Sequence, residues 1–175
     1  MIDPIHELKV RAEILHARVQ EHDTGVLKRL RVLSEFRRSP DGHLIGTARH
    51  QHCLRVIAAE WGFPGYREAK RALSGEEPSP DFGALLYPNK CCGHLNRWYK
   101  IYEEAAEVRK DCRGYLLGYR HQYVVVDRYF IETLGLDPDD PDWEALGFDW
   151  VRPAEITART RLYSKLVSQL PREAA

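Results

Sequence analysis

Apolar residues in the first part of the chain recur at steps of three and four, and this period restricts that part to amphipathic helices. The stripe that opens the chain consists of Ile5, Leu8, Ala12, Leu15 and Val19. Asp3 and Pro4 stand just before it, as a helix N-cap and a first-turn proline do. The sequence therefore predicts that the chain begins with a helix that buries one face.

Three further helices are predicted before the composition changes. The second begins after Asp23 and continues through Phe36, beyond which a stretch rich in turn formers ends it. The third has Thr47 as its cap, and "YREAKRAL" forms a short fourth helix. Residues 1–74 are therefore predicted to be a compact, all-helical unit.

A different pattern follows this unit. Residues 75–83 are the predicted linker, because this Ser-, Pro-, Gly- and acid-rich stretch has no apolar period. Further on, "YLLGYRHQYVVVD" is typical of one long strand or of a hairpin that turns near 120–122. Residues 84–175 are therefore predicted to be an α+β unit. The predicted fold class is mainly α with a small β element, in which an N-terminal helical unit precedes a small sheet packed with helices.

Helices are also predicted around that sheet. Apolar spacing predicts one from Leu95 to Arg109, and Asp127 is placed to cap a short helix after the strand. Asp140 is the expected cap of another short helix, with a proline in its first turn. A final helix is expected over "PAEITARTRLYSKLVSQL".

The charge balance argues against a nucleic-acid binder. Lys and Arg number 26, as do Asp and Glu, so the formal net charge is +0 and no basic excess is present to collect phosphates. The stretch "CLRVIAAEWGFPGYREAKRAL" has the turn spacing of a helix-turn-helix unit, but Glu68 and Arg71 occupy positions that such a unit buries. We therefore predict no nucleic-acid partner.

The N-terminal "MIDPIHELKV" carries acid and proline where a secretory signal would be basic and then apolar. No stretch approaches the roughly 18 apolar residues that a membrane span needs. The four cysteines are expected to be free thiols or ligands rather than bridges, as in a reducing compartment. A cytoplasmic protein without membrane contact is predicted.

Part of the helical unit carries a resemblance. Residues from about 5 to 74, through "LKVRAEILHARVQ" and "RHQHCLRVIAAEWGFPGYREAKRAL", resemble a small helical accessory module of bacterial glyoxalase-superfamily-related proteins. The shared pattern is an apolar helix, then "GF", then an aromatic near Tyr66, where Trp is more usual, and a second apolar helix. The resemblance implies a helical accessory fold and transfers no activity. Residues 75–175 resemble uncharacterised bacterial proteins only.

The most unusual chemistry in the sequence is a Cys-Cys-Gly-His run. Cys91, Cys92 and His94 stand at a predicted helix start, where the positive end of the helix dipole favours a thiolate. Cys92 with His94 is therefore the candidate catalytic pair. Together with Cys91 and His121 they are also the candidate metal ligands, and zinc is the ion that such a set would take as a cofactor. Ordinary packing of the two cysteines beneath the helix is the alternative.

A second candidate site lies on the predicted strand region. Tyr119, Arg120, His121 and Tyr123 could line a pocket for an anionic group, because an arginine fork matches carboxylate or phosphate. In an alternating strand, Tyr119, His121 and Tyr123 would share one face and Arg120 would lie on the other. The alternative is an ordinary exposed strand with its polar residues outward.

Two functional hypotheses follow. The first is a small binding or regulatory module that holds a protein partner or a small molecule, since no strong catalytic signature is present. The second is a thiol- or metal-dependent enzyme that uses the cluster of Cys91, Cys92 and His94. Convergence of Cys92, His94 and His121 in one cleft would favour the enzyme.

Overall fold

The computed structural model describes residues 2–76 and 81–170 of this chain. Its first part is helical throughout, as the apolar period predicted. The helices are α1 (Pro4–Gln20), α2 (Thr24–Leu30), the 3-10 helix η1 (Ser34–Phe36), α3 (Asp41–Thr47), α4 (His50–Glu60) and α5 (Tyr66–Ser74).

The second part surrounds a small antiparallel sheet. Its elements are the 3-10 helix η2 (Asn89–Cys91), β1 (Arg97–Tyr99), α6 (Tyr102–Cys112), β2 (Tyr115–Tyr119), β3 (Gln122–Val126), α7 (Arg128–Leu134), α8 (Pro141–Ala145) and α9 (Ile156–Ser168). The strand order is β1-β3-β2. The predicted fold class, mainly α with a small β element, is therefore confirmed.

Helix α1 forms for the reasons that its sequence indicated. The Asp3 carboxylate accepts a hydrogen bond from the Ile5 amide at 2.9 Å, which satisfies an amide at the helix start. Leu8, Ala12 and Leu15 on the predicted stripe are buried. This stripe packs mainly against α4, so burial of one apolar face holds the two longest helices of this half together.

The predicted second helix is too long. It ends at Leu30, and Phe36 belongs to the separate turn η1. The stretch rich in turn formers beyond Phe36 contains α3, whose Leu44 is fully buried in the core. Pro40 precedes α3 at its N-cap, where a residue with fixed φ and no amide donor suits a helix start better than a break.

The sheet turns as a hairpin at Arg120 and His121. Tyr119 pairs with Gln122 at the tip, and Arg120 has a left-handed φ of 49°. The predicted helix from Leu95 is wrong in its first two turns, because residues 97–99 pair with β3 as a strand. Trp98 lies opposite Val124 of β3, and such pairs of an aromatic with a β-branched residue stabilise a sheet.

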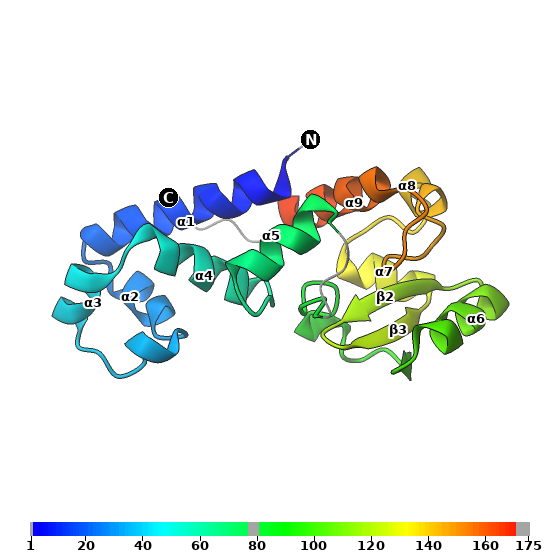
Figure 1. Ribbon diagram of the computed structural model, residues 1–175, viewed down its shortest axis with the longest axis horizontal. Helices are drawn as coiled ribbons and strands as arrows, with labels where there is room; N and C mark the ends of the chain where they lie inside the picture. The colour runs from blue at the N-terminus through cyan, green and yellow to red at the C-terminus, as the bar shows by residue number, and fades with distance from the viewer. Residues whose placement is uncertain (1, 77–80, 171–175) are drawn as a thin grey trace.

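The two parts share one hydrophobic core. Helix α9, at the end of the chain, packs against α1 and α5, and Figure 1 shows α1 and α9 along the same side of the molecule. Arg159 of α9 is buried and donates to the carbonyls of Trp150 at 3.1 Å and Glu76 at 3.3 Å. The predicted linker 75–83 includes residues 77–80, which lie outside the described residues, so the division into two units stays a prediction.

Candidate functional site

The Cys-Cys-Gly-His run does not begin an α-helix. Cys91 ends the short turn η2, Cys92 is its C-cap, and the next α-helix begins only at Tyr102. The prediction of a helix start at Cys92 is therefore wrong. The physical reason is that residues 97–99 pair with β3, so no α-helix can run from Cys92 through them. Among the described residues, Cys92 follows a short turn and does not begin an α-helix.

The two cysteines have opposite environments. Cys91 is buried, and this burial raises the pKa of its thiol although the Lys90 charge acts in the other direction. Cys92 is exposed. Adjacent side chains that point into the core and into solvent do not converge on one ion, as tetrahedral coordination would require.

The histidines of the predicted metal set are also apart. Nε2 of His94 lies 3.0 Å from Oγ1 of Thr133, and its ring packs on Phe130. His121 is at the hairpin tip, with Nε2 3.7 Å from the Asp81 carboxylate. Within residues 2–76 and 81–170, no group of three or more His, Cys, Asp or Glu side chains is placed to hold a metal. The predicted zinc ligands Cys91, Cys92, His94 and His121 are thus not assembled there.

The predicted ligand-binding residues divide between the two faces of the sheet. Gly118 pairs with Tyr123 and Tyr119 with Gln122, so Tyr119 and Tyr123 point to opposite sides. Tyr123 packs on Phe82 with ring centroids 5.9 Å apart. The expectation that Tyr119, His121 and Tyr123 share a face is wrong, because the chain turns between them. Tyr119 and Arg120 remain together.

Tyr119 and Arg120 line a cleft of about 630 Å³ at the junction of the two parts. One wall is the end of α4 with the turn after it, and the other walls come from the segment before η2, the hairpin and the ends of α7 and α9. The apolar lining is Trp61, Ala84, Leu85, Tyr87, Pro88, Tyr119, Leu134, Leu166 and Leu170. The polar lining is Glu60, Asn89, Lys90, Arg120 and Gln169, beside Gly62.

The charges in the cleft favour an anion. Glu60 is already paired, since both its oxygens accept from the Arg29 guanidinium at 2.7 Å. Lys90 donates to the Leu134 carbonyl at 3.1 Å, which positions its ammonium, and among residues 2–76 and 81–170 it makes no ion pair with a carboxylate. The Arg120 side chain makes no ion pair within the part of the chain that the structure describes. Two cations thus face the cleft beside one neutralised carboxylate.

Arg120 is held in place by its backbone. Its amide donates to the Gly83 carbonyl at 2.8 Å, and its own carbonyl accepts from the Phe82 amide at 2.9 Å. The neighbouring Ala84 amide donates to the Gly62 carbonyl at 2.8 Å, which fixes the same segment to the end of α4. The guanidinium carbon lies 5.5 Å from the Tyr119 ring centroid, within the range of a cation–π contact. The backbone of Arg120 is therefore fixed at the cleft, and its exposed side chain lies against the Tyr119 ring.

Aromatic rings make the wall beside Arg120. Tyr87 packs on Tyr119 with centroids 5.4 Å apart and on Trp98 at 4.9 Å. The Tyr87 hydroxyl accepts a hydrogen bond from the Asn96 amide at 2.9 Å, so the ring is fixed at both ends. Such a wall offers flat apolar surface next to two positive charges.

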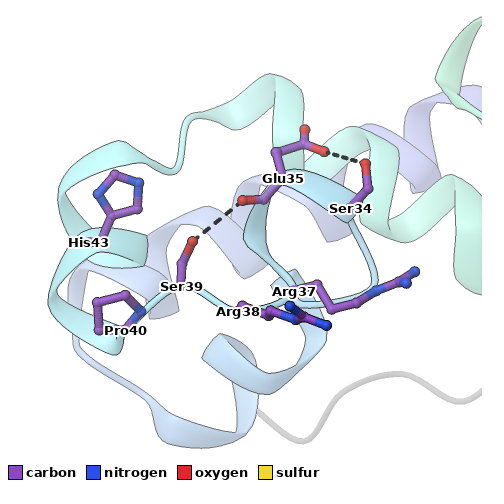
Figure 2. Close-up of a pocket in the computed structure, with 7 residues that line it drawn as sticks. All are labelled: Ser34, Glu35, Arg37, Arg38, Ser39, Pro40 and His43. Atoms are coloured by element: carbon purple, nitrogen blue, oxygen red, sulfur yellow. Dashed lines mark hydrogen bonds between the residues drawn. The ribbon is translucent and has the colours of Figure 1, made fainter.

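A second hollow of about 610 Å³ lies on the helical part, between η1 and the start of α3 (Figure 2). Figure 2 shows Arg37 and Arg38 extending side by side, away from His43. The Glu35 carboxylate is occupied by Arg55 and by the Ser34 hydroxyl. The polar groups of this hollow therefore point away from one another, and they do not form a site comparable to the cleft.

Sequence reasoning found Tyr119 and Arg120 but missed the remainder of the cleft. Trp61, Lys90 and Leu134 were not candidates, because they meet only when α4, η2 and α7 pack. The signal that the sequence offered was the pair of glycines Gly62 and Gly83. In the structure they have left-handed φ angles of 81° and 69° and form the turns beside the cleft.

Comparisons with known proteins add no relative to this description. No family model matches the sequence, and neither the curated proteins nor the solved structures contain a match to it. The resemblance of residues 5–74 to a helical accessory module stays a prediction. No helix within the described ranges has the length and apolar character that crossing a membrane requires.

Proposed function

We propose that this protein is a small binding module, and that its junction cleft holds a small organic anion with a flat apolar body. The observation that carries the proposal is that Arg120, whose backbone is fixed, lines the cleft with Lys90 and an aromatic wall, while the carboxylate of the cleft is already paired. The proposal keeps a small-molecule partner in preference to a protein partner. A concave cleft at a junction between structural parts is where such ligands are usually held.

The energetics support a ligand with both an apolar body and a charged group. Contact with the leucine side chains and the Tyr87 ring would remove apolar surface from water at about 25 cal/mol per Å². A charge-assisted hydrogen bond to Arg120 would add about 1.5–3 kcal/mol. Because the Arg120 backbone is already fixed, the ordering cost at this residue is that of its side chain, about 0.5–1.5 kcal/mol.

The test compares two probes of one shape. Naphthoate carries the carboxylate and naphthylmethanol is its neutral counterpart, and their affinities are measured by titration calorimetry. We expect naphthoate to bind about tenfold more tightly than the alcohol. Arg120→Gln should remove this preference and leave the alcohol unaffected.

Arg37→Gln is the matched control, because Arg37 lies at the hollow of Figure 2 and far along the chain from the cleft. It should leave both affinities unchanged. Equal affinity of the wild-type protein for the two probes, or an equal loss in the two arginine variants, would refute the proposal.

A cytoplasmic location and the absence of a nucleic-acid partner belong to the same proposal. Cys53, Cys91, Cys92 and Cys112 are free thiols, which suits a reducing compartment. The balanced charge supports binding of a small anion at one cleft rather than of a polyanion along a surface. A salt-sensitive, sequence-selective band shift with duplex DNA would contradict the second statement.

A further inference from the structure

A third hollow, distinct from the cleft, lies at the end of the sheet where β1 begins and β3 ends. Its volume is about 450 Å³. The residues that line it include Arg97 of β1, Cys112 and Arg113 at the end of α6, Tyr115 of β2, and Arg128 at the start of α7. Leu95, fully exposed, stands at its rim. Three arginines from three separate elements therefore line one depression.

Two of these arginines carry uncompensated charge. Within the described ranges, neither Arg97 nor Arg113 makes an ion pair with a carboxylate. Arg128 is different, since it pairs with Asp139 at 2.8 Å and with Glu132 at 3.6 Å. The remaining carboxylate of the hollow, on Asp127, accepts the Phe130 amide at 2.9 Å as a helix cap.

The backbone fixes both unpaired arginines. Arg97 is in register with Val125 on the central strand, so its place at the sheet edge is set by strand pairing. Arg113 is the left-handed C-cap of α6 at φ 52°, and the next amide, of Gly114, donates to the Arg109 carbonyl at 3.1 Å.

Gly114 is closely packed where it lines the hollow. A Cβ at this position would lie 2.8 Å from the Val126 carbonyl oxygen, 3.1 Å from the Cys112 Sγ and 3.2 Å from the Val125 Cγ1. This part of the wall therefore depends on glycine, and the exposed Cys112 thiol lies beside it.

We propose that this hollow binds an oxyanion, the phosphate group of a small molecule, between the guanidinium groups of Arg97 and Arg113. Planar guanidinium forks match the oxygens of phosphate, and Arg97 and Arg113 line the hollow from two different elements. The proposal is independent of the cleft, because the two sites share no lining residue.

The exposed Cys112 thiol is a reporter inside the hollow, and the exposed Cys92 thiol is its control outside. The whole protein is alkylated in parallel with iodoacetate, an anion, and with neutral iodoacetamide at equal, low ionic strength. Peptide mapping gives the rate at each cysteine. The iodoacetate-to-iodoacetamide rate ratio should be about fivefold larger at Cys112 than at Cys92.

Arg97→Gln combined with Arg113→Gln should make the two ratios equal, and Arg97→Gln alone should have part of this effect. Continued protection of the buried Cys53 and Cys91 shows that the variants are folded. Inorganic phosphate or phenyl phosphate, with chloride at the same ionic strength as reference, should slow iodoacetamide at Cys112 and not at Cys92.

The two phosphates identify the source of the oxyanion. Equal protection indicates a free phosphate, and stronger protection by phenyl phosphate indicates a monoester whose body rests on Leu95 and Tyr115. Equal rate ratios at Cys112 and Cys92 in the wild-type protein, or no protection by either phosphate, would overturn the proposal.

Discussion

The junction cleft and the hollow of Figure 2 have nearly the same volume, about 630 Å³ and about 610 Å³, but they are built differently. The hollow is lined by a single short segment, residues 34–43. The cleft takes residues from five stretches that are distant in the sequence, from Glu60 to Leu170. In the cleft the polar groups face a common space, and in the hollow they diverge.

Convergence of polar groups, and not volume, therefore distinguishes a candidate site from a surface depression. A single turn places neighbouring side chains like Arg37 and Arg38 on its outer surface, where water solvates them. Two opposing walls must come from separate elements that a shared core holds together. Here α9 links the two parts by packing on α1 and α5. Whether the cleft depends on that long-range packing can be tested at individual residues.

The largest effect is expected at the turn that joins the two parts. Gly62 has a φ of 81°, and an added Cβ would lie 2.7 Å from the Ala84 Cβ. Gly62→Val should therefore lower the free energy of unfolding by about 3 kcal/mol, from left-handed strain and overpacking. Urea denaturation measures this, and naphthoate binding should be lost with it.

Gly46→Ala is the control for that variant. Gly46 lies within α3, near the hollow of Figure 2, and a Cβ there meets nothing within 4 Å. The change should raise stability by up to about 1 kcal/mol through helix propensity. If Gly62→Val is as harmless as Gly46→Ala, the cleft wall is not fixed in the way described.

The sequence predicted those features that depend on local chemistry. Asp127 caps α7 through the Phe130 amide and Asp140 caps α8 through the Asp142 amide, as their positions indicated. The apolar stripe of α1 was also correct, because burial of one helix face leaves a period that the sequence retains.

The features that failed depend on partners distant in the sequence. The Cys-Cys-Gly-His run has the composition of a reactive site, but pairing of residues 97–99 with β3 removed the helix start on which that interpretation depended. In the cleft, Arg120 could be proposed from its own stretch. Lys90 could not, because it reaches the cleft only where α7 packs against η2.

An intermediate effect, dependent on pH, is expected where α9 is anchored. Asp142 is buried, and burial alone would raise the pKa of its carboxyl. The hydrogen bonds and charges of Lys165 and Arg161, at 2.7 Å each, outweigh this and hold its pKa below the ordinary value. The folded state thus favours the ionised form, so its stabilisation is complete above about pH 4 and is lost as pH falls through the lowered pKa.

Asp142→Asn should lower the unfolding free energy by about 2 kcal/mol at neutral pH, since it leaves two cations without their shared carboxylate. The difference from the wild-type protein should shrink as pH falls from about 4 through the lowered pKa of Asp142, because the carboxyl takes up a proton in the unfolded chain before it does so in the folded protein. Urea titrations at several pH values check this. A difference that does not change with pH would mean that the ion pairs do not anchor α9.

The smallest effect is expected from the paired carboxylate of the cleft. Glu60→Gln removes a charge that Arg29 already offsets, so the fold should keep its stability within about 0.5 kcal/mol. Naphthoate affinity should rise by about threefold and naphthylmethanol affinity should not change. A fall in naphthoate affinity would show that Glu60 itself contacts the ligand.

The most direct test of the cleft is to map where naphthoate binds, by amide chemical-shift changes in the isotope-labelled whole protein. We predict chemical-shift changes at the amides of Gly62, Asn89 and Gln169, which belong to separate walls of the cleft, and none at residues 34–43. Shifts at the amides of Arg38, Ser39 and His43 without shifts at the three cleft residues would contradict it.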